Sequence, residues 1–145
     1  MGLTSKLKST EKFALDTNIF IYAAAKESPF KTPALDLLDY IRKKSPKTFI
    51  SVIVLEEFFI RMYRLGTLEK FPYYMDLVTA GDSITLVNVT REIALRAAKI
   101  RAQFNLKAPD AIHLASAIES GAKTFITIDR RIPKKINGLA IKTLE

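Results

Sequence analysis

The sequence predicts a single α/β domain with a parallel sheet and helices on both faces. Short apolar runs rich in β-branched and aromatic residues alternate along the chain with segments whose apolar residues recur at helical spacing. This alternation is typical of βαβ units, in which parallel strands are covered by the connecting helices. The chain has 145 residues, 48% of them hydrophobic, which is enough to bury the core of one ordinary domain.

Five strands and six helices are expected, in alternation. The strands are expected at residues 13–15, 48–52, 84–89, 124–129 and 139–143. The helices are expected at residues 18–26, 34–44, 53–63, 68–79, 91–104 and 110–119. Residues 1–11 are polar and basic and are expected to form a flexible tail, so that residues 12–145 make up the domain.

Capping and breaking residues support these helix bounds. Thr32, before a proline, and Thr90 are typical N-caps. Gly66, Asn105 and Gly121 are typical of helix ends. In addition, Pro72 is expected to break the segment 68–79, and Pro109 to open the last helix.

Composition excludes several classes of site. The chain has no cysteine, which excludes disulfides and thiolate metal sites and fits a cytoplasmic protein. Its single histidine excludes an all-histidine zinc site. No apolar run approaches the length of a membrane span, so no membrane partner is expected. The net charge of +8 fits either a solvated basic surface or a polyanionic partner such as nucleic acid.

Four acidic positions are expected at one edge of the sheet. Asp16 and Asp129 end the first and fourth strands, Asp110 begins the last helix, and Glu56 or Glu57 lies early in the helix after the second strand. Strand ends and the first turns of the following helices share the carboxyl edge of a parallel sheet, where ligands bind in open α/β folds.

Each acid also has a purely structural interpretation. Asp16 is a good helix cap, Asp110 complements a helix dipole, and Asp129 can form a turn with a nearby arginine. Arg61, four residues after Glu57, is a possible ion-pair partner for that glutamate. Periodicity alone does not choose between the two glutamates.

Four converging carboxylates repel one another unless a cation lies among them. Ligands that are all oxygen favour Mg²⁺ or Mn²⁺ over zinc or copper. Such ions activate water and stabilise the leaving oxygen in phosphodiester hydrolysis. A basic surface around an acidic pocket is therefore typical of a nuclease.

At these residues the sequence resembles the PIN-domain family, and within it the VapC-type toxin ribonucleases. Four segments carry the resemblance, in the family's order. They are Leu15-Asp16-Thr17-Asn18, Ser51 to Phe58, Lys107 to Ala115 and Thr127-Ile128-Asp129. The register of the second segment selects Glu57 over Glu56.

The resemblance implies a three-layer αβα fold with a five-stranded parallel sheet in the order 3-2-1-4-5. It implies a Mg²⁺- or Mn²⁺-dependent endoribonuclease acting on RNA, the toxin of a type II toxin–antitoxin pair. The implied metal ligands and catalytic residues are Asp16, Glu57, Asp110 and Asp129, with Asn18 and Thr127 in support. Homodimerisation and inhibition by a small antitoxin are also implied.

Four arginines, Arg61, Arg64, Arg130 and Arg131, are candidates for binding the substrate, with a solvated surface as the alternative. His113 is a candidate general base, but a filling residue of the last helix is the favoured interpretation. A PIN-domain ribonuclease of housekeeping RNA processing and a non-catalytic nucleic-acid-binding module remain alternative functions. Cleavage that requires metal and Asp16 distinguishes an enzyme from a binding module.

Overall fold

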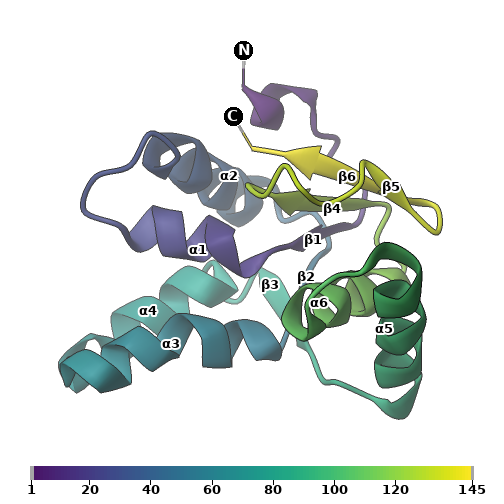
Figure 1. Cartoon of the computed structure of the whole chain (residues 1–145). Helices are drawn as coiled ribbons and strands as arrows, with labels where there is room; N and C mark the ends of the chain where they lie inside the picture. Colours follow the sequence, from purple (N-terminus) through teal and green to yellow (C-terminus); the bar gives the residue numbers. More distant parts are fainter. Residues whose placement is uncertain (1, 145) are drawn as a thin grey trace.

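Six strands form one sheet in the order β3-β2-β1-β4-β6-β5 in the computed structural model, which describes residues 2–144 (Figure 1). The strands are β1 Phe13–Leu15, β2 Thr48–Ser51, β3 Ile84–Val87, β4 Thr124–Thr127, β5 Lys135–Ile136 and β6 Leu139–Thr143. All neighbours pair in parallel except β5 and β6, which are antiparallel. The predicted parallel order is confirmed for the five longer strands.

The sixth strand, β5, was not expected. It has two residues, too few to show any periodicity. It joins β6 through Asn137 and Gly138, both with positive φ, at 48° and 85°. This is the backbone of a tight hairpin, and Asn-Gly is the strongest short sequence signal for one.

Six α-helices and two short 3₁₀ helices connect the strands among residues 2–144. The α-helices are α1 Thr17–Ala24, α2 Lys31–Lys44, α3 Ile53–Leu65, α4 Phe71–Thr79, α5 Arg91–Phe104 and α6 Ala108–Glu119. The 3₁₀ helices are η1 Leu3–Lys6 and η2 Leu68–Lys70. The predicted break near Pro72 corresponds to the junction between η2 and α4.

Most predicted helix ends are confirmed. The Thr90 hydroxyl caps α5 by accepting a hydrogen bond from Ile93 N at 3.2 Å, and Gly66 and Asn105 end their helices in the left-handed conformation. Thr32 is not an N-cap. Helix α2 begins three residues earlier than predicted, at Lys31, because Phe30 already has helical geometry and takes the N-cap position. Pro33 lies in the first turn, where its missing N–H costs nothing.

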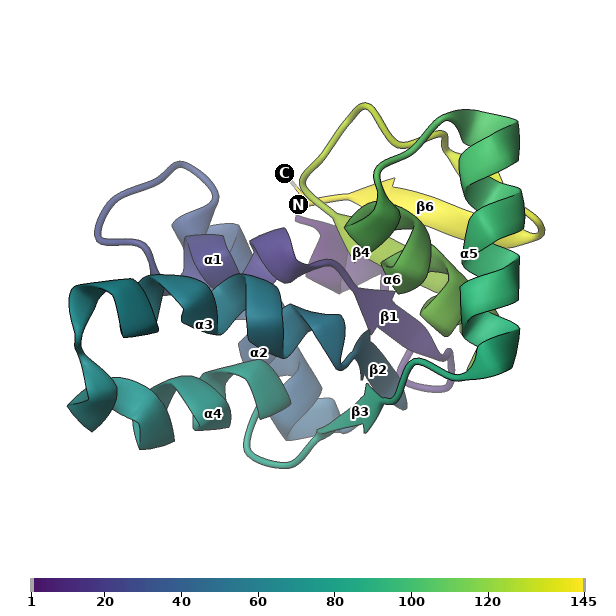
Figure 2. The same cartoon turned by 60° about the horizontal axis from the view of Figure 1, so that its bottom comes forward.

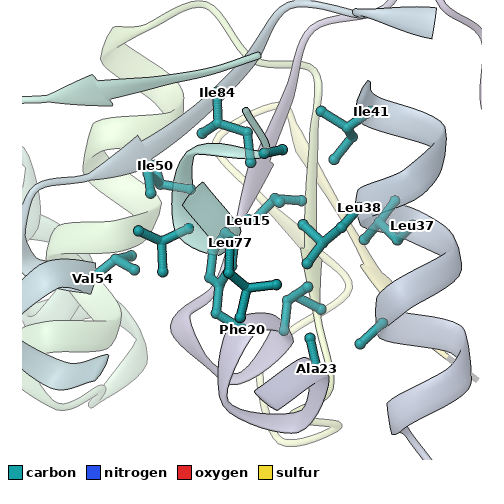
Figure 3. Close-up of a cluster of buried hydrophobic side chains, with 14 of the residues drawn as sticks. Leu15, Phe20, Ala23, Leu37, Leu38, Ile41, Ile50, Val54, Leu77 and Ile84 are labelled. Atoms are coloured by element: carbon teal, nitrogen blue, oxygen red, sulfur yellow. The ribbon is translucent and has the colours of Figure 1, made fainter. Parts of the chain in front are cut away.

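Alternate strand residues face two separate hydrophobic cores. Leu15 and Ile126 face a core formed with α1 to α4, whereas Ala14 and Phe125 face a core formed with α5 and α6. Figure 3 shows the first core, in which Phe20 of α1 lies close to Leu15 and Leu77. The expected helices on both faces of the sheet are therefore present (Figure 2).

The amino-terminal segment, expected to be a flexible tail, contacts the domain. Leu7 is 9% exposed and belongs to the first core. Its carbonyl accepts a hydrogen bond from the Tyr40 hydroxyl of α2 at 3.4 Å. The basic residues of the segment therefore lie on either side of Leu7, which is packed into the first core.

The carboxyl ends of β1 and β4 lie at the topological switch point of the sheet, which we call the crevice. From β1 the chain proceeds to β2 and β3 on one side, and then crosses to β4 on the other. In open α/β sheets, ligands bind at the point where the direction of winding reverses. None of the helices among residues 2–144 is long and apolar enough to cross a membrane.

Candidate active site

Asp16 lies at this crevice, directly after β1. It is 6% exposed and caps α1, its Oδ1 accepting a hydrogen bond from Thr17 N at 2.8 Å. Burial raises the pKa of the Asp16 carboxyl, against the opposing effects of His113 and of the hydrogen bond from Thr127. Asp16 therefore caps α1 and also lies at the edge of the sheet where open α/β folds bind ligands.

Thr127 links Asp16 to the end of β4. Its hydroxyl donates to Asp16 Oδ2 at 2.8 Å and accepts from Asp129 N at 3.0 Å and from Asn18 Nδ2 at 3.2 Å. Asn18 in turn accepts a hydrogen bond from Ile128 N through its Oδ1 at 3.2 Å. Thr127 is fully buried, so this network fixes how β1 and β4 present their acids.

Glu57 shares a polar cluster with Thr17 and His113. The Thr17 hydroxyl donates to Glu57 Oε1 at 2.7 Å, and His113 Nε2 contacts the same oxygen at 2.5 Å. Burial raises the pKa of Glu57, but the hydrogen bonds from His113 and Thr17 outweigh it and hold the pKa below its ordinary value. Helical spacing suggested Arg61 as the partner of Glu57. The structure shows that the partner is His113.

His113 is more than a filling residue of α6. It is 2% exposed, and its Nδ1 is a buried nitrogen with no hydrogen-bond partner in the described part of the chain. A proton on Nδ1 would thus be buried without an acceptor, so the tautomer with its proton on Nε2 fits best. That proton lies toward Glu57 and positions its carboxylate.

Asp110 lies in the first turn of α6, half-buried, and is electrostatically coupled to the other acids. Burial raises its pKa; His113 opposes this increase, whereas Glu57 and Asp129 add to it. Asp110 also raises the pKa of Asp16. The four predicted acids are therefore brought to the same edge of the sheet, near enough to affect one another's charge.

Asp129 is held by Arg131, two residues further along the chain. The guanidinium Nε and Nη2 each donate to a different carboxylate oxygen at 2.9 Å, and these bonds hold the pKa of Asp129 below its ordinary value. The expected turn with a local ion pair is therefore present.

Residues 2–144 contain no group of three or more His, Asp or Glu side chains arranged closely enough to hold a metal ion. The hydrogen bonds explain this arrangement. Arg131 holds both oxygens of Asp129, while Glu57 is bonded to His113 and Thr17. A four-carboxylate ligand set would require Asp129 to leave Arg131.

The other three candidate arginines are exposed and lie in different places. Arg61 lines a cavity of about 260 Å³ between α1, α3 and α4. Arg64 lies on α3 beside Glu56 and Tyr63, and Arg130 lines a cavity beside β6.

Together, the fold and the site define an α/β protein with an acidic cluster at the crevice of a parallel sheet. A family model for the PIN domain matches residues 13–137. The chain belongs to the PIN-domain family, as its four motifs predicted. A search of curated protein sequences found no significant match.

Three solved structures cover nearly the whole chain. A chain of the VapBC2 structure from Rickettsia felis, bound to a DNA fragment from its promoter, aligns with a TM-score of 0.72, 19% identity and coverage of 92% of this chain and 99% of that chain. A chain of a toxin–antitoxin complex from Klebsiella pneumoniae aligns with a TM-score of 0.65 and 25% identity, covering 90% of this chain and 95% of that chain. A chain of the DNA-bound VapBC structure from Salmonella typhimurium aligns with a TM-score of 0.61 and 19% identity, covering 92% of this chain and 98% of that chain.

Proposed function

We propose that this protein is a metal-dependent endoribonuclease and the toxin of a type II toxin–antitoxin pair. The observation that carries the proposal is the buried Asp16 carboxylate at the crevice, held by Thr127 and electrostatically coupled to Asp110. Membership of the PIN family and the likeness to toxin–antitoxin structures support the same function.

The donor set fits a hard divalent cation. Every proposed ligand atom is a carboxylate oxygen, from Asp16, Glu57, Asp110 and Asp129, the ligands that Mg²⁺ and Mn²⁺ prefer. The charges of Glu57 and Asp129 raise the pKa of Asp110, and the Arg131 guanidinium binds Asp129. Both observations indicate that the acidic cluster favours a nearby positive charge. When bound, such an ion supplies acidity to water and charge for the phosphate oxygens.

The side chains of this chain then have separate tasks. Asn18 and Thr127 orient Asp16, while Thr17 and His113 orient Glu57. Arg131 is within reach of the site because it already contacts Asp129, and on release it provides a cation for the RNA phosphate.

The direct test is cleavage of structured RNA with Mg²⁺ or Mn²⁺. The wild type should cleave, EDTA should abolish cleavage, and Asp16→Asn should reduce the rate by at least about 100-fold, because the charge that the site needs is lost. Circular dichroism should show that the variant is folded. Cleavage that persists in the variant would place the active site elsewhere.

Metal binding should also be visible without activity. Mg²⁺ at about 100 times its Kd should stabilise the wild type by about 2.7 kcal/mol through binding linkage. Asp110→Asn should show a smaller increase in Tm, whereas Asp36→Asn, on the surface of α2, should respond like the wild type. An equal increase in all three proteins would contradict metal binding at Asp110.

The small antitoxin is the proposed protein partner. The cavity between α1, α3 and α4 has an apolar lining that includes Ile21, Phe58, Met62 and Tyr74, which suits an amphipathic helix. Induced expression should arrest growth, and co-expression of the adjacent antitoxin gene should restore it. Growth arrest without such rescue would favour housekeeping RNA processing.

The proposed homodimer rests on the resemblance. Large apolar side chains are exposed near the α3–α4 turn, among them Leu65 and Tyr73. Sedimentation of the purified protein tests this directly, with a monomer mass as the contrary result.

A further inference from the structure

A cavity of about 520 Å³ lies beside the crevice, between η1, the loop after β4, and β6. Four cations line it: Lys6, Arg130, Lys134 and Lys142. No acidic side chain among the described residues lines it, and none of the four cations forms an ion pair within residues 2–144. Its charge is therefore uncompensated by the part of the chain that the structure describes.

The walls of this cavity come from distant parts of the chain. Figure 1 shows η1 lying beside the end of β6, which brings Lys6 near Lys142. Leu3, Ile132 and Ile141 add apolar surface between the charged groups. Cations around an apolar surface suit a ligand with alternating phosphates and less polar sugars and bases.

The cavity adjoins the loop that carries Asp129. Arg130 directly follows Asp129 in the chain, and Leu144 N, one residue beyond β6, donates to the carbonyl of Thr127 at 2.8 Å. Thr127 is the residue whose hydroxyl holds Asp16. A strand bound at Asp129 would therefore lie beside Arg130, one of these cations.

We propose that this cavity binds the backbone of the RNA strand on one side of the cleaved bond. The inference rests on the proposed ribonuclease function and extends it to Lys6, Lys134 and Lys142. An RNA strand is favoured over a protein because four uncompensated cations match a polyanion, and one of them, Arg130, directly follows the proposed ligand Asp129. The contacts are to phosphates, so they position the strand without reading its sequence.

Binding to RNA without cleavage tests the cavity directly. In the Asp16→Asn background, Lys6, Lys134 and Lys142 are all changed to alanine, and fluorescence anisotropy measures the Kd for a labelled single-stranded RNA of about 16 nucleotides. The substitutions should weaken binding at least about tenfold and reduce the slope of log Kd against log salt by about 2, because three phosphate contacts are lost.

A matched control removes the same charge at the opposite edge of the sheet. Lys12, Lys47 and Lys123 are exposed and directly precede β1, β2 and β4. Their combined change to alanine should leave the Kd within about twofold of the parent, since only long-range attraction changes. Equal losses in both triple variants would overturn the proposal, because the effect would then be one of net charge.

Cleavage separates this inference from the proposed function. With active protein, the cavity variant should lose kcat/KM for long RNA, mainly through KM, and retain it for a substrate too short to reach the cavity. Loss on both substrates, or on neither, would overturn the cavity assignment while leaving the nuclease in place. Unchanged RNA binding with lost antitoxin binding would also overturn it, in favour of a protein partner.

If the wild type cleaves no RNA, the ribonuclease function fails, and the anisotropy measurement still decides whether the cavity binds an RNA backbone.

Discussion

The acidic cluster has an inner pair and an outer pair that are built differently. The inner pair, Asp16 and Glu57, is held by buried donors from other elements: Thr127 for Asp16, and Thr17 and His113 for Glu57. In the outer pair, Asp129 is held by an exposed arginine two residues away, and Asp110 has no side-chain hydrogen bond among residues 2–144. Folding therefore sets the inner pair, whereas the outer pair is free to adapt to a cation.

The largest effect is expected when the support of the inner pair is removed. Thr127→Val keeps the shape of the side chain but leaves Asp16 without one donor and Asp129 N without an acceptor. Asn18 Nδ2 keeps only its 3.4 Å contact with Asp16 Oδ2. Unfolding in urea should show a loss of about 2–3 kcal/mol, the cost of unpaired buried polar groups. Thr124→Val, buried at the opposite end of β4, is the control. Similar losses in both variants would mean that strand packing dominates.

His113 provides the second test of the inner pair. His113→Ala removes a donor from Glu57 and opens space in the core, so a loss of about 1–3 kcal/mol in the free energy of unfolding is expected, together with a lower kcat. His113→Gln retains an N–H donor and should restore kcat in part while KM stays constant. Identical kcat values in the two variants would contradict a positioning role.

Asp110 tests the outer pair through the pH dependence of stability without metal. Because its pKa is raised in the folded protein, stability is lost as the pH rises from the ordinary value of 3.8 through the folded value. In EDTA, Asp110→Asn should equal the wild type in acid and have the higher Tm at neutral pH. A lower Tm at neutral pH would instead support stabilisation of the α6 dipole by the carboxylate.

The smallest effect is expected from Arg131→Ala. The Arg131 side chain is 85% exposed, so solvent screens its ion pair with Asp129 and the pair should contribute little to the free energy of unfolding. Because the pKa of Asp129 is lowered in the fold, this contribution is present above 3.8 and disappears as the pH falls through the folded value. Urea unfolding at neutral and acid pH measures this contribution. A loss of stability as large as that of Thr127→Val would show that Asp129 is held as firmly as Asp16.

Sequence reasoning predicted the elements that carry the acids, because strand and helix periodicity are local properties. The order of the strands in the sheet came from the resemblance to the PIN-domain family. It did not predict the partner of Glu57. His113 is 56 residues away, on another helix, and no local pattern connects α3 with α6. Arg61 was the only basic residue three or four positions from Glu57 on the same helix. In the fold, Arg61 instead lines the cavity between α1, α3 and α4.

The structural and functional interpretations of the acids proved compatible. Asp16 does cap α1, and Asp129 does pair with an arginine. In both cases the local role fixes or holds a carboxylate that faces the crevice. Sequence reasoning had set these roles against one another, although a capping carboxylate retains a second oxygen for other partners.

The hydrogen bond between Thr127 and Asp16 joins residues 111 positions apart in the chain. A nascent chain that has released only β1 to α6 from the ribosome lacks both this hydroxyl and Asp129. The acidic site is therefore completed only after residues 124–129 have left the ribosome, when β4 inserts beside β1. A chain truncated before residue 124 should be unable to assemble it, so any activity of the site requires β4 to have been translated.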